Sequence, residues 1–316
     1  MSDTVPSPPL SVDGLVGLDV SKWQGKIDWS KVPALGVRWA VAKCTHGSTG
    51  VDSQFLNNRE GIRASGISFG AYHWFLPAQD PIKQAQHFVE TAGALQDGDI
   101  GLAVDFEEAQ GLTGTALLDP LVLHLREVTR LTGRRPLLYT GSWFWTQHVQ
   151  NLDSAECAAY PLWVAMYPST RRDAREYRDA VLSLPLDVPV PLPWSKRGLQ
   201  EAIWQFDGDG GLFLTSTVDV DVNRLRDGDL DGLIQSTYCQ DPQALPLTLD
   251  PTELQRALNG LGFSVGDIDG KIGAKTRAAL EAYKSSRGLT AQTVRAKLEK
   301  EYVELAACQN PPPPAC

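Results

Sequence analysis

Two carboxylates at the end of an apolar stretch are the first sign of chemistry in this sequence. Asp105 and Glu107 follow GLAV in the segment GLAVDFEE, residues 101–108. Residues two apart in a β-strand point to the same face, about 7 Å apart along the backbone, whereas Glu108 points away. In a partly apolar cleft such a pair repels and loses hydration, which raises the pKa of at least one acid. A protonated acid beside an anion is what a glycosidase needs to protonate a leaving oxygen and stabilise positive charge on a sugar.

Eight short apolar runs bounded by Gly, Pro or polar residues predict the strands that position these acids. They are residues 17–21, 38–44, 68–75, 101–107, 136–140, 162–167, 202–206 and 218–222. Helical patterns separate the early runs, at 53–66, 81–95 and 119–131, the last with Asp119 as its predicted N-cap.

This alternation of strand and helix favours a parallel α/β sheet. Eight strands over about 210 residues predict a closed barrel that lacks its last helices. An open doubly wound sheet is the alternative fold. It usually has a glycine-rich phosphate loop after the first strand, where this chain has KWQGKIDW.

Polar side chains gather where the predicted strands end, which is where the active sites of such barrels lie. They are Asp19, Thr45, His46, His73, Asp105, Glu107, Tyr139, Gln205 and Asp221. Aromatic rings near the same ends could stack on sugar faces, although each could instead pack in the core: Trp23, Tyr72, Trp74, Tyr139, Trp163 and Trp204. Together these residues predict a polar cleft with aromatic walls.

Seven blocks, in their order, resemble the lysozymes of glycoside hydrolase family 25. They are GLDVSKWQGKIDW, YHWF, LAVDFEE, PLLYTG, PLWVAMY, IWQF and VDVNRL, between about Gly17 and Leu233. The resemblance implies an irregular eight-stranded β/α barrel that lacks some helices. It also implies an N-acetylmuramidase, which cuts the β-1,4 bond between N-acetylmuramic acid and N-acetylglucosamine in peptidoglycan.

The resemblance also implies roles for four acids. Glu107 would be the general acid, and Asp105 would assist the substrate's own N-acetyl group as it attacks the anomeric carbon, an exception to the two-carboxylate schemes. Asp19 would lie in the cleft floor, and Asp221 fits the family's Val-Asp-x-Asn pattern, with Asp219 as the alternative. The substrate-binding residues expected are Tyr72, Trp74, Tyr139, Trp163, Gln205 and His46.

One departure from the family pattern leaves other functions open. His46, in KCTHG, stands where the family commonly has Glu. A non-catalytic peptidoglycan-binding protein is therefore one alternative, and a hydrolase of another N-acetylated glycan such as chitin is a second.

Residues 250–290 resemble the three-helix peptidoglycan-binding module found beside many wall hydrolases, with a generic helical cap as the alternative. The sequence predicts a helix, a glycine-rich turn, a second helix begun near Ala274 and a third helix after it. The wall-binding residues expected are Gln255, Asp269, Gly270 and Thr276. The predicted organisation is a flexible segment 1–13, a catalytic barrel 14–236 and a binding domain 237–316 with a proline-rich tail.

Composition and net charge exclude several classes of binding partner. The 316 residues carry a net charge of −9, and the nine acids and nine bases after residue 240 leave all of it on the barrel. An acidic surface argues against nucleic acid, and no apolar run reaches the roughly 18 residues that span a membrane. No metal or cofactor is expected, because the five histidines lack zinc-site spacing. We expect a monomer that binds bacterial peptidoglycan.

The N-terminal stretch MSDTVPSPPLSVDG has no secretory signal pattern. The chain is therefore expected to be made in the cytoplasm and to act on the cell wall as a released phage lysin, an injected effector or a secreted enzyme trimmed of its signal. Cys44 is expected to be a buried thiol, and pairing among Cys239, Cys308 and Cys316 stays open.

Overall fold

The computed structural model describes residues 16–167, 188–208, 220–238, 251–269 and 274–287. Contacts divide the chain into two compact units, Met1–Gln240 and Asp241–Cys316. The predicted boundary after residue 236 falls four residues before this division, and the predicted flexible segment 1–13 lies outside the described residues.

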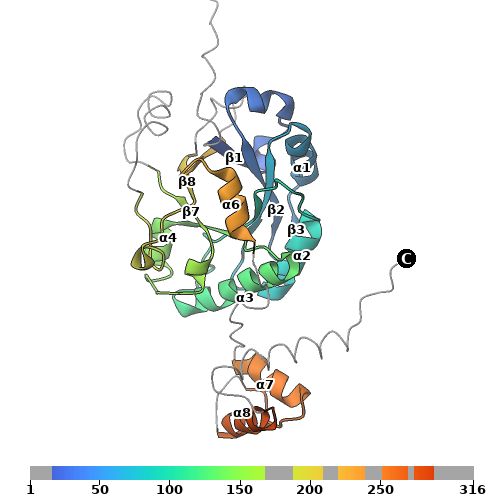
Figure 1. Cartoon of the computed structure of the whole chain (residues 1–316), viewed down its shortest axis with the longest axis vertical. Helices are drawn as coiled ribbons and strands as arrows, with labels where there is room; N and C mark the ends of the chain where they lie inside the picture. Colours follow the sequence, from blue (N-terminus) through green and yellow to red (C-terminus); the bar gives the residue numbers. More distant parts are fainter. Residues whose placement is uncertain (1–15, 168–187, 209–219, 239–250, 270–273, 288–316) are drawn as a thin grey trace, which may run out of the picture. The chain divides into compact units, whose positions relative to one another are not determined.

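Nine strands of the first unit form one sheet that closes on itself (Figure 1). They are β1 (Val16–Val20), β2 (Trp39–His46), β3 (Gly50–Val51), β4 (Ser68–Trp74), β5 (Gly101–Asp105), β6 (Leu137–Gly141), β7 (Leu162–Ala165), β8 (Ile203–Asp207) and β9 (Asp221–Leu225). β1 pairs with both β2 and β9, which closes the barrel. Because β3 only extends β2 as a short antiparallel hairpin, the predicted eight-stranded barrel is confirmed.

The last strand departs from the prediction in position and direction. It was expected at 218–222 with Asp221 near its end, but β9 begins at Asp221 and runs antiparallel to both β8 and β1. The stretch GDGGLFLTSTV before it carries no helical pattern that could cross the sheet, as a parallel connection requires. Since β9 is antiparallel, its first residue still meets the rim where the parallel strands end.

Helices lie around the outside of the barrel (Figure 1). They are α1 (Phe55–Ala64), α2 (Pro81–Ala92), α3 (Thr115–Thr132) and α4 (Ser142–Gln147). A further helix, α6 (Leu230–Thr237), instead packs its Leu233 against the side chains that fill the barrel interior. Short 3₁₀ helices occur at Lys22–Gln24, Trp29–Leu35, Cys157–Ala159 and Ser195–Arg197. α1 packs on β2 and β4, and α2 packs on β2 and α3. α2 begins where predicted, because the Asp80 carboxylate accepts the backbone N–H groups of Ile82 and Lys83.

The predicted start of the third helix is wrong. α3 begins at Thr115, so that Asp119 and Pro120 lie within the helix rather than at its cap. Leu117 and Leu118 are buried, and the free energy gained by burying them favours the extra turn before the Asp-Pro pair.

Large side chains fill the inside of the barrel below its rim, including Trp39, Val41, Ile100 and Ile203. Gly17 of β1 makes room for one of them, because a Cβ atom there would lie 2.1 Å from the Trp39 ring. This packed interior is the floor on which the site rests.

The second unit contains α7 (Pro251–Gly260) and α8 (Ala274–Ser286). Among its described residues, the buried apolar side chains that pack together are Ala257, Leu258, Val265, Ala279 and Tyr283. The second helix begins where predicted, whereas the predicted third helix lies outside the described residues. Within the described ranges of both units, no helix has the length and apolar character to cross a membrane.

Candidate active site

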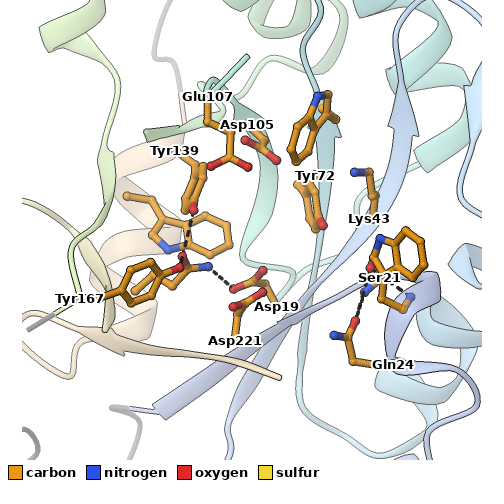
Figure 2. Close-up of a pocket in the computed structure, with 14 residues that line it drawn as sticks. Asp19, Ser21, Gln24, Lys43, Tyr72, Asp105, Glu107, Tyr139, Tyr167 and Asp221 are labelled. Atoms are coloured by element: carbon orange, nitrogen blue, oxygen red, sulfur yellow. Dashed lines mark hydrogen bonds between the residues drawn. The ribbon is translucent and has the colours of Figure 1, made fainter. Parts of the chain in front are cut away.

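A cavity of about 240 Å³ opens at the rim where the parallel strands end (Figure 2). It brings together all four predicted catalytic acids and the predicted substrate-binding residues apart from His46. Its lining is Asp19, Ser21, Trp23, Gln24, Lys43, Tyr72, Trp74, Asp105, Glu107, Tyr139, Trp163, Tyr167, Gln205 and Asp221.

Strand alternation puts Asp105 and Glu107 on the same wall. Phe106, between them, is fully buried on the other side, and its N–H donates to the Tyr139 carbonyl at 2.9 Å, which carries the β5–β6 ladder past the end of β5. Glu108 is turned away, and its carboxylate accepts the N–H of Gln110 at 3.1 Å. The two carboxyls in the cavity are therefore the two that the sequence pattern predicts.

Burial controls the protonation of this pair. It raises the pKa of Asp105 well above its ordinary value, and the nearby charge of Glu107 raises it further. Burial also raises the pKa of Glu107, with a second contribution from Asp19, while Lys43 and a hydrogen bond from Tyr139 act in the opposite direction. The pair therefore keeps a proton to higher pH than free carboxyls do.

The second pair of acids forms the cavity floor. Asp19 and Asp221 are register partners across β1 and β9. The Oδ2 atom of Asp19 accepts from the Nε2 of Gln205 at 2.9 Å and the Nδ2 of Asn223 at 2.8 Å. Burial raises the pKa of Asp19, and burial with the charge of Asp19 raises the pKa of Asp221 to about 9. Near neutral pH this pair holds one proton.

Two tyrosines, one in β6 and one just after β7, extend this network up the wall of the cavity. The hydroxyls of Tyr139 and Tyr167 both donate to the Oε1 of Gln205, at 2.9 and 2.6 Å (Figure 2). The indole N–H of Trp163 donates to the Oδ1 of Asn223 at 2.8 Å. Tyr167, the last residue of the predicted strand 162–167, is a site residue that the sequence pattern did not identify; β7 ends at Ala165, two residues before it.

Lys43 supplies a positive charge to the cavity. Its Nζ lies 4.1 Å from the centroid of the Trp74 ring and 5.6 Å from that of Tyr72, a cation–π arrangement that holds the side chain in place. Burial lowers its pKa, and the charge of Asp105 is the largest effect that opposes this. Sequence reasoning missed Lys43, although a lone lysine in the apolar run RWAVAKC was a usable signal.

The 3₁₀ helix after β1 presents an aromatic ring. Ser21 and Gln24 form a capping box, and the backbone N–H of Lys22 donates to the buried Asp52 at 3.0 Å. The Trp23 ring that this turn carries is 76% exposed at the cavity edge. Trp204, another of the aromatic residues near the predicted strand ends, packs in the core and donates its indole N–H to the Met166 carbonyl at 2.8 Å.

Three of the predicted strand-end residues do not reach the cavity. His46 is exposed and pairs with Gly50 in the β2–β3 hairpin. Thr45 and His73 face the helices instead, with the Thr45 Oγ1 2.8 Å from the His73 Nδ1. A bulge after Lys43 shifts the register of β2, and alternation places His73 opposite its neighbours Tyr72 and Trp74.

In the second unit, the predicted wall-binding residues form a buried link. The Nε2 of Gln255 donates to the Oδ1 of Asp269 at 2.9 Å and to the Oγ1 of Thr276 at 3.2 Å, which joins α7 to the following loop and to α8. Gln255 and Thr276 are buried, and Gly270 lies outside the described residues. In the parts of both units that the structure describes, no cluster of three or more His, Cys, Asp or Glu side chains could hold a metal ion.

A barrel with paired carboxyls at its strand ends is the architecture of a glycoside hydrolase. Comparison with known families agrees with that class. The chain belongs to glycosyl hydrolases family 25, whose model matches residues 18–211. Residues 249–293 match the model named "Putative peptidoglycan binding domain".

Individual relatives match the barrel. The uncharacterized protein YegX of Escherichia coli K12 is 35% identical over 162 residues, which are 50% of this chain and 58% of that protein. Lysozyme M1 of Streptomyces globisporus is 31% identical over 167 residues, 50% of this chain and 56% of that protein. The chain thus spans under three fifths of the length of these curated relatives. The bacterial lysozyme structure from Streptomyces coelicolor shares the fold, with a TM-score of 0.58 and 24% identity over 72% of this chain and 98% of that one.

Proposed function

We propose that the barrel hydrolyses the β-1,4 bond between N-acetylmuramic acid and N-acetylglucosamine in peptidoglycan. The observation that carries this proposal is the pair Asp105 and Glu107, held side by side in one cavity with pKa values raised by burial. Similarity to Lysozyme M1 supports the substrate class. The match to a peptidoglycan-binding family supports the same polymer as partner.

In the first step, the Glu107 carboxylic acid gives its proton to the glycosidic oxygen as the bond to the anomeric carbon breaks. The carbonyl oxygen of the substrate's N-acetyl group attacks that carbon and forms a cyclic oxazolinium ion. Asp105 would accept the N–H of the same acetamido group. Its Oδ1 is buried and has no hydrogen-bond partner among the described residues. A buried acceptor without a donor costs free energy, and the N–H of the substrate would supply that donor.

In the second step, Glu107 is a carboxylate and takes a proton from water. The resulting hydroxide equivalent attacks the anomeric carbon, the cyclic ion opens, and the N-acetyl group is restored. Glu107 is then protonated again for the next cycle. As a carboxylate, Asp105 would stabilise the positive charge of the cyclic ion, and its low-dielectric surroundings strengthen that interaction.

The test is release of reducing sugar ends from purified peptidoglycan by the whole chain and by Glu107→Gln. Loss of a general acid lowers the rate about 10²–10⁴-fold. Glu108→Gln is the matched control, because that carboxylate is turned out of the cavity. A Glu107→Gln protein that keeps wild-type turnover would remove Glu107 from the mechanism.

A non-catalytic wall-binding protein is the second candidate, and His46 is the observation that favours it. The wild-type chain would then sediment with insoluble peptidoglycan but release no reducing ends at any pH. His46→Glu would be the first reversion to try. A hydrolase of another N-acetylated glycan is the third candidate, and faster release of ends from chitin than from peptidoglycan would identify it.

The second unit would keep the enzyme on its polymer. A second binding site on the same chain raises the effective concentration of the catalytic barrel near the glycan. We propose the bacterial cell wall as the place of action. Removal of residues 241–316 should lower turnover on insoluble peptidoglycan more than on short soluble glycan fragments.

A further inference from the structure

Lys43 brings an ammonium group into the cavity. Of the described residues that form the lining, it is the only cation, beside four carboxyls. Its Nζ lies 4.1 Å from the centroid of the Trp74 ring and 5.6 Å from that of Tyr72. Within the described parts of the chain this Nζ makes no ion pair and no hydrogen bond. An ammonium carries three N–H donors, so this half-buried group can take an acceptor from a ligand.

Asp105 offers the complementary group on the same wall. Its Oδ1 is buried and lacks a donor among the described residues. Lys43 of β2 is the register partner of Tyr72 in β4, and Trp74 of β4 is the register partner of Asp105 in β5. Figure 2 shows Lys43 and Asp105 on the two sides of Tyr72. Because the Lys43 Nζ lies over Trp74, this wall presents a cationic donor near a carboxyl acceptor, each free to meet a ligand.

One sugar of peptidoglycan carries the matching pair of groups. N-acetylmuramic acid has an acetamido N–H on C2 and, on the adjacent C3, a lactyl ether that ends in a carboxyl group. N-acetylglucosamine has the same acetamido group but only a hydroxyl on C3. A sugar whose N–H donates to Asp105 presents its C3 substituent beside that carboxyl. There the lactyl group would supply a charged acceptor, whereas a hydroxyl would not.

We propose that Lys43 binds the lactyl carboxyl group of the N-acetylmuramic acid whose acetamido N–H is held by Asp105. Lys43 thereby selects this sugar over N-acetylglucosamine at that position. In glycan without stem peptides the acceptor is the free lactyl carboxylate, and in the intact wall it is the carbonyl oxygen of the lactyl amide. The inference rests on the proposed function, because it deepens the choice of substrate at the same site.

A second effect of Lys43 is common to all glycans. Its charge opposes the burial that raises the pKa of Glu107, whichever sugar is bound. Pairing with a lactyl carboxyl instead stabilises only those complexes that contain muramic acid, so the ratio of affinities for two glycans isolates the pairing. The rings of Trp74 and Tyr72 hold the Lys43 side chain before binding, which lowers the entropy cost of ordering it.

The experiment measures Kd by calorimetry for two tetrasaccharides of equal length. One alternates N-acetylglucosamine and peptide-free N-acetylmuramic acid, and the other is chitotetraose. Both are titrated into the full chain carrying Glu107→Gln, which keeps them intact, with and without Lys43→Met. Methionine has a similar length and packs well on aromatic rings. Loss of a charge-assisted hydrogen bond should raise Kd for the muramyl tetrasaccharide about 10- to 100-fold, with a change of less than about 2-fold for chitotetraose.

Lys22→Met is the matched control. The Lys22 Nζ also lies over an aromatic ring, 5.1 Å from the centroid of Trp23, but Lys22 is exposed and does not line the cavity. Its replacement should leave the ratio of the two Kd values unchanged. Unchanged chitotetraose binding also shows that Lys43→Met keeps the cavity folded. An equal loss of affinity for both tetrasaccharides in Lys43→Met, or no loss for either, would overturn the proposal.

A separate measurement distinguishes failure of this inference from failure of the proposed function. A wild-type chain that releases no reducing ends from peptidoglycan would count against the hydrolase proposal, while the two Kd values would still decide whether Lys43 reads the lactyl group. A wild-type chain that cleaves peptidoglycan, together with a ratio that Lys43→Met does not change, would overturn the inference alone. Any binding by the second unit is the same in every variant, because each is measured as the full chain.

Discussion

Asp19 and Asp221 face each other as register partners across the antiparallel pair of β1 and β9, and burial with the charge of Asp19 raises the pKa of Asp221 to about 9. Two neighbouring buried carboxyls do not both ionise near neutral pH. The amides of Gln205 and Asn223 both donate to Asp19 and so stabilise it as the anion. The proton therefore resides on Asp221, and the cavity floor carries one negative charge rather than two.

Replacement of Asp221 by Asn should become more favourable for stability as pH rises. The folded-state pKa of Asp221, about 9, is far above the usual value near 3.9. Its stabilising contribution is therefore fully present below about pH 4 and is lost as pH rises toward 9. Because Asn does not titrate, Asp221→Asn should gain stability relative to wild type over this range. Urea unfolding at pH 5, 7 and 9 measures the difference, and a constant difference would contradict the assignment of the proton.

A buried pair of stacked histidines predicts the opposite pH dependence of stability: the free energy of unfolding should fall as pH decreases. His73 and His124 lie 4.9 Å apart between β4 and the outer helices, and burial lowers the pKa of His124 to about 4. The stabilisation is fully present above the unfolded value near 6.5 and is lost as pH falls toward 4. The free energy of unfolding should fall by about 3 kcal/mol over that range, since one pKa unit is about 1.4 kcal/mol.

The variant that checks this is His124→Phe, which keeps an aromatic ring beside His73. Its unfolding free energy, measured with urea between pH 7 and 4.5, should depend less steeply on pH than that of wild type. His148→Gln, at the partly exposed position that follows α4, is the control and should follow the wild-type curve. Parallel curves for wild type and His124→Phe would rule out His124 as the titrating group.

Simple alternation was enough to find much of the site from the sequence. Asp105 and Glu107 share a face because Phe106 occupies the other one. The same rule puts Tyr72 and Trp74 in the cavity and His73 against the helices. The prediction that His73 lies in the cleft is wrong, because its position in the alternation turns it to the face opposite Tyr72 and Trp74 even though it lies near a strand end.

The remaining errors come from features that a linear pattern does not contain. Lys43 follows the alternation of Trp39 and Val41 and faces the acids. The bulge after Lys43 then changes the parity of β2, so that Thr45 pairs with His73 and faces the helices instead of the cavity. Asp221 reaches the rim from the start of a strand rather than its end, because β9 is antiparallel. Tyr167 lines the cavity and donates to Gln205, which lies 38 positions away, a contact between two strand ends that the linear pattern does not show.

Gln255→Leu should destabilise the second unit while leaving the barrel intact. The substitution removes the donor to Asp269 and Thr276, and the loss of a buried link of this kind costs about 1–3 kcal/mol. Hydrogen exchange of residues 251–287 in the full chain should become faster. Tryptophan fluorescence should not change, since all nine Trp residues lie before residue 205. Unchanged exchange would mean that the apolar core alone holds α7 and α8 together.

Trp23 should contribute to glycan binding without contributing to stability. Its ring is 76% exposed at the cavity edge, so Trp23→Ala removes little buried surface and should leave Tm within about 2 °C of wild type. Loss of a stacking ring costs about 0.5–1.5 kcal/mol, which corresponds to a rise in KM of roughly 2- to 12-fold on soluble glycan fragments. Trp143→Ala is the matched control, because that ring is 54% exposed but does not line the cavity. Equal effects of the two substitutions would show that exposed aromatic surface in general, rather than the edge of this cavity, binds the glycan.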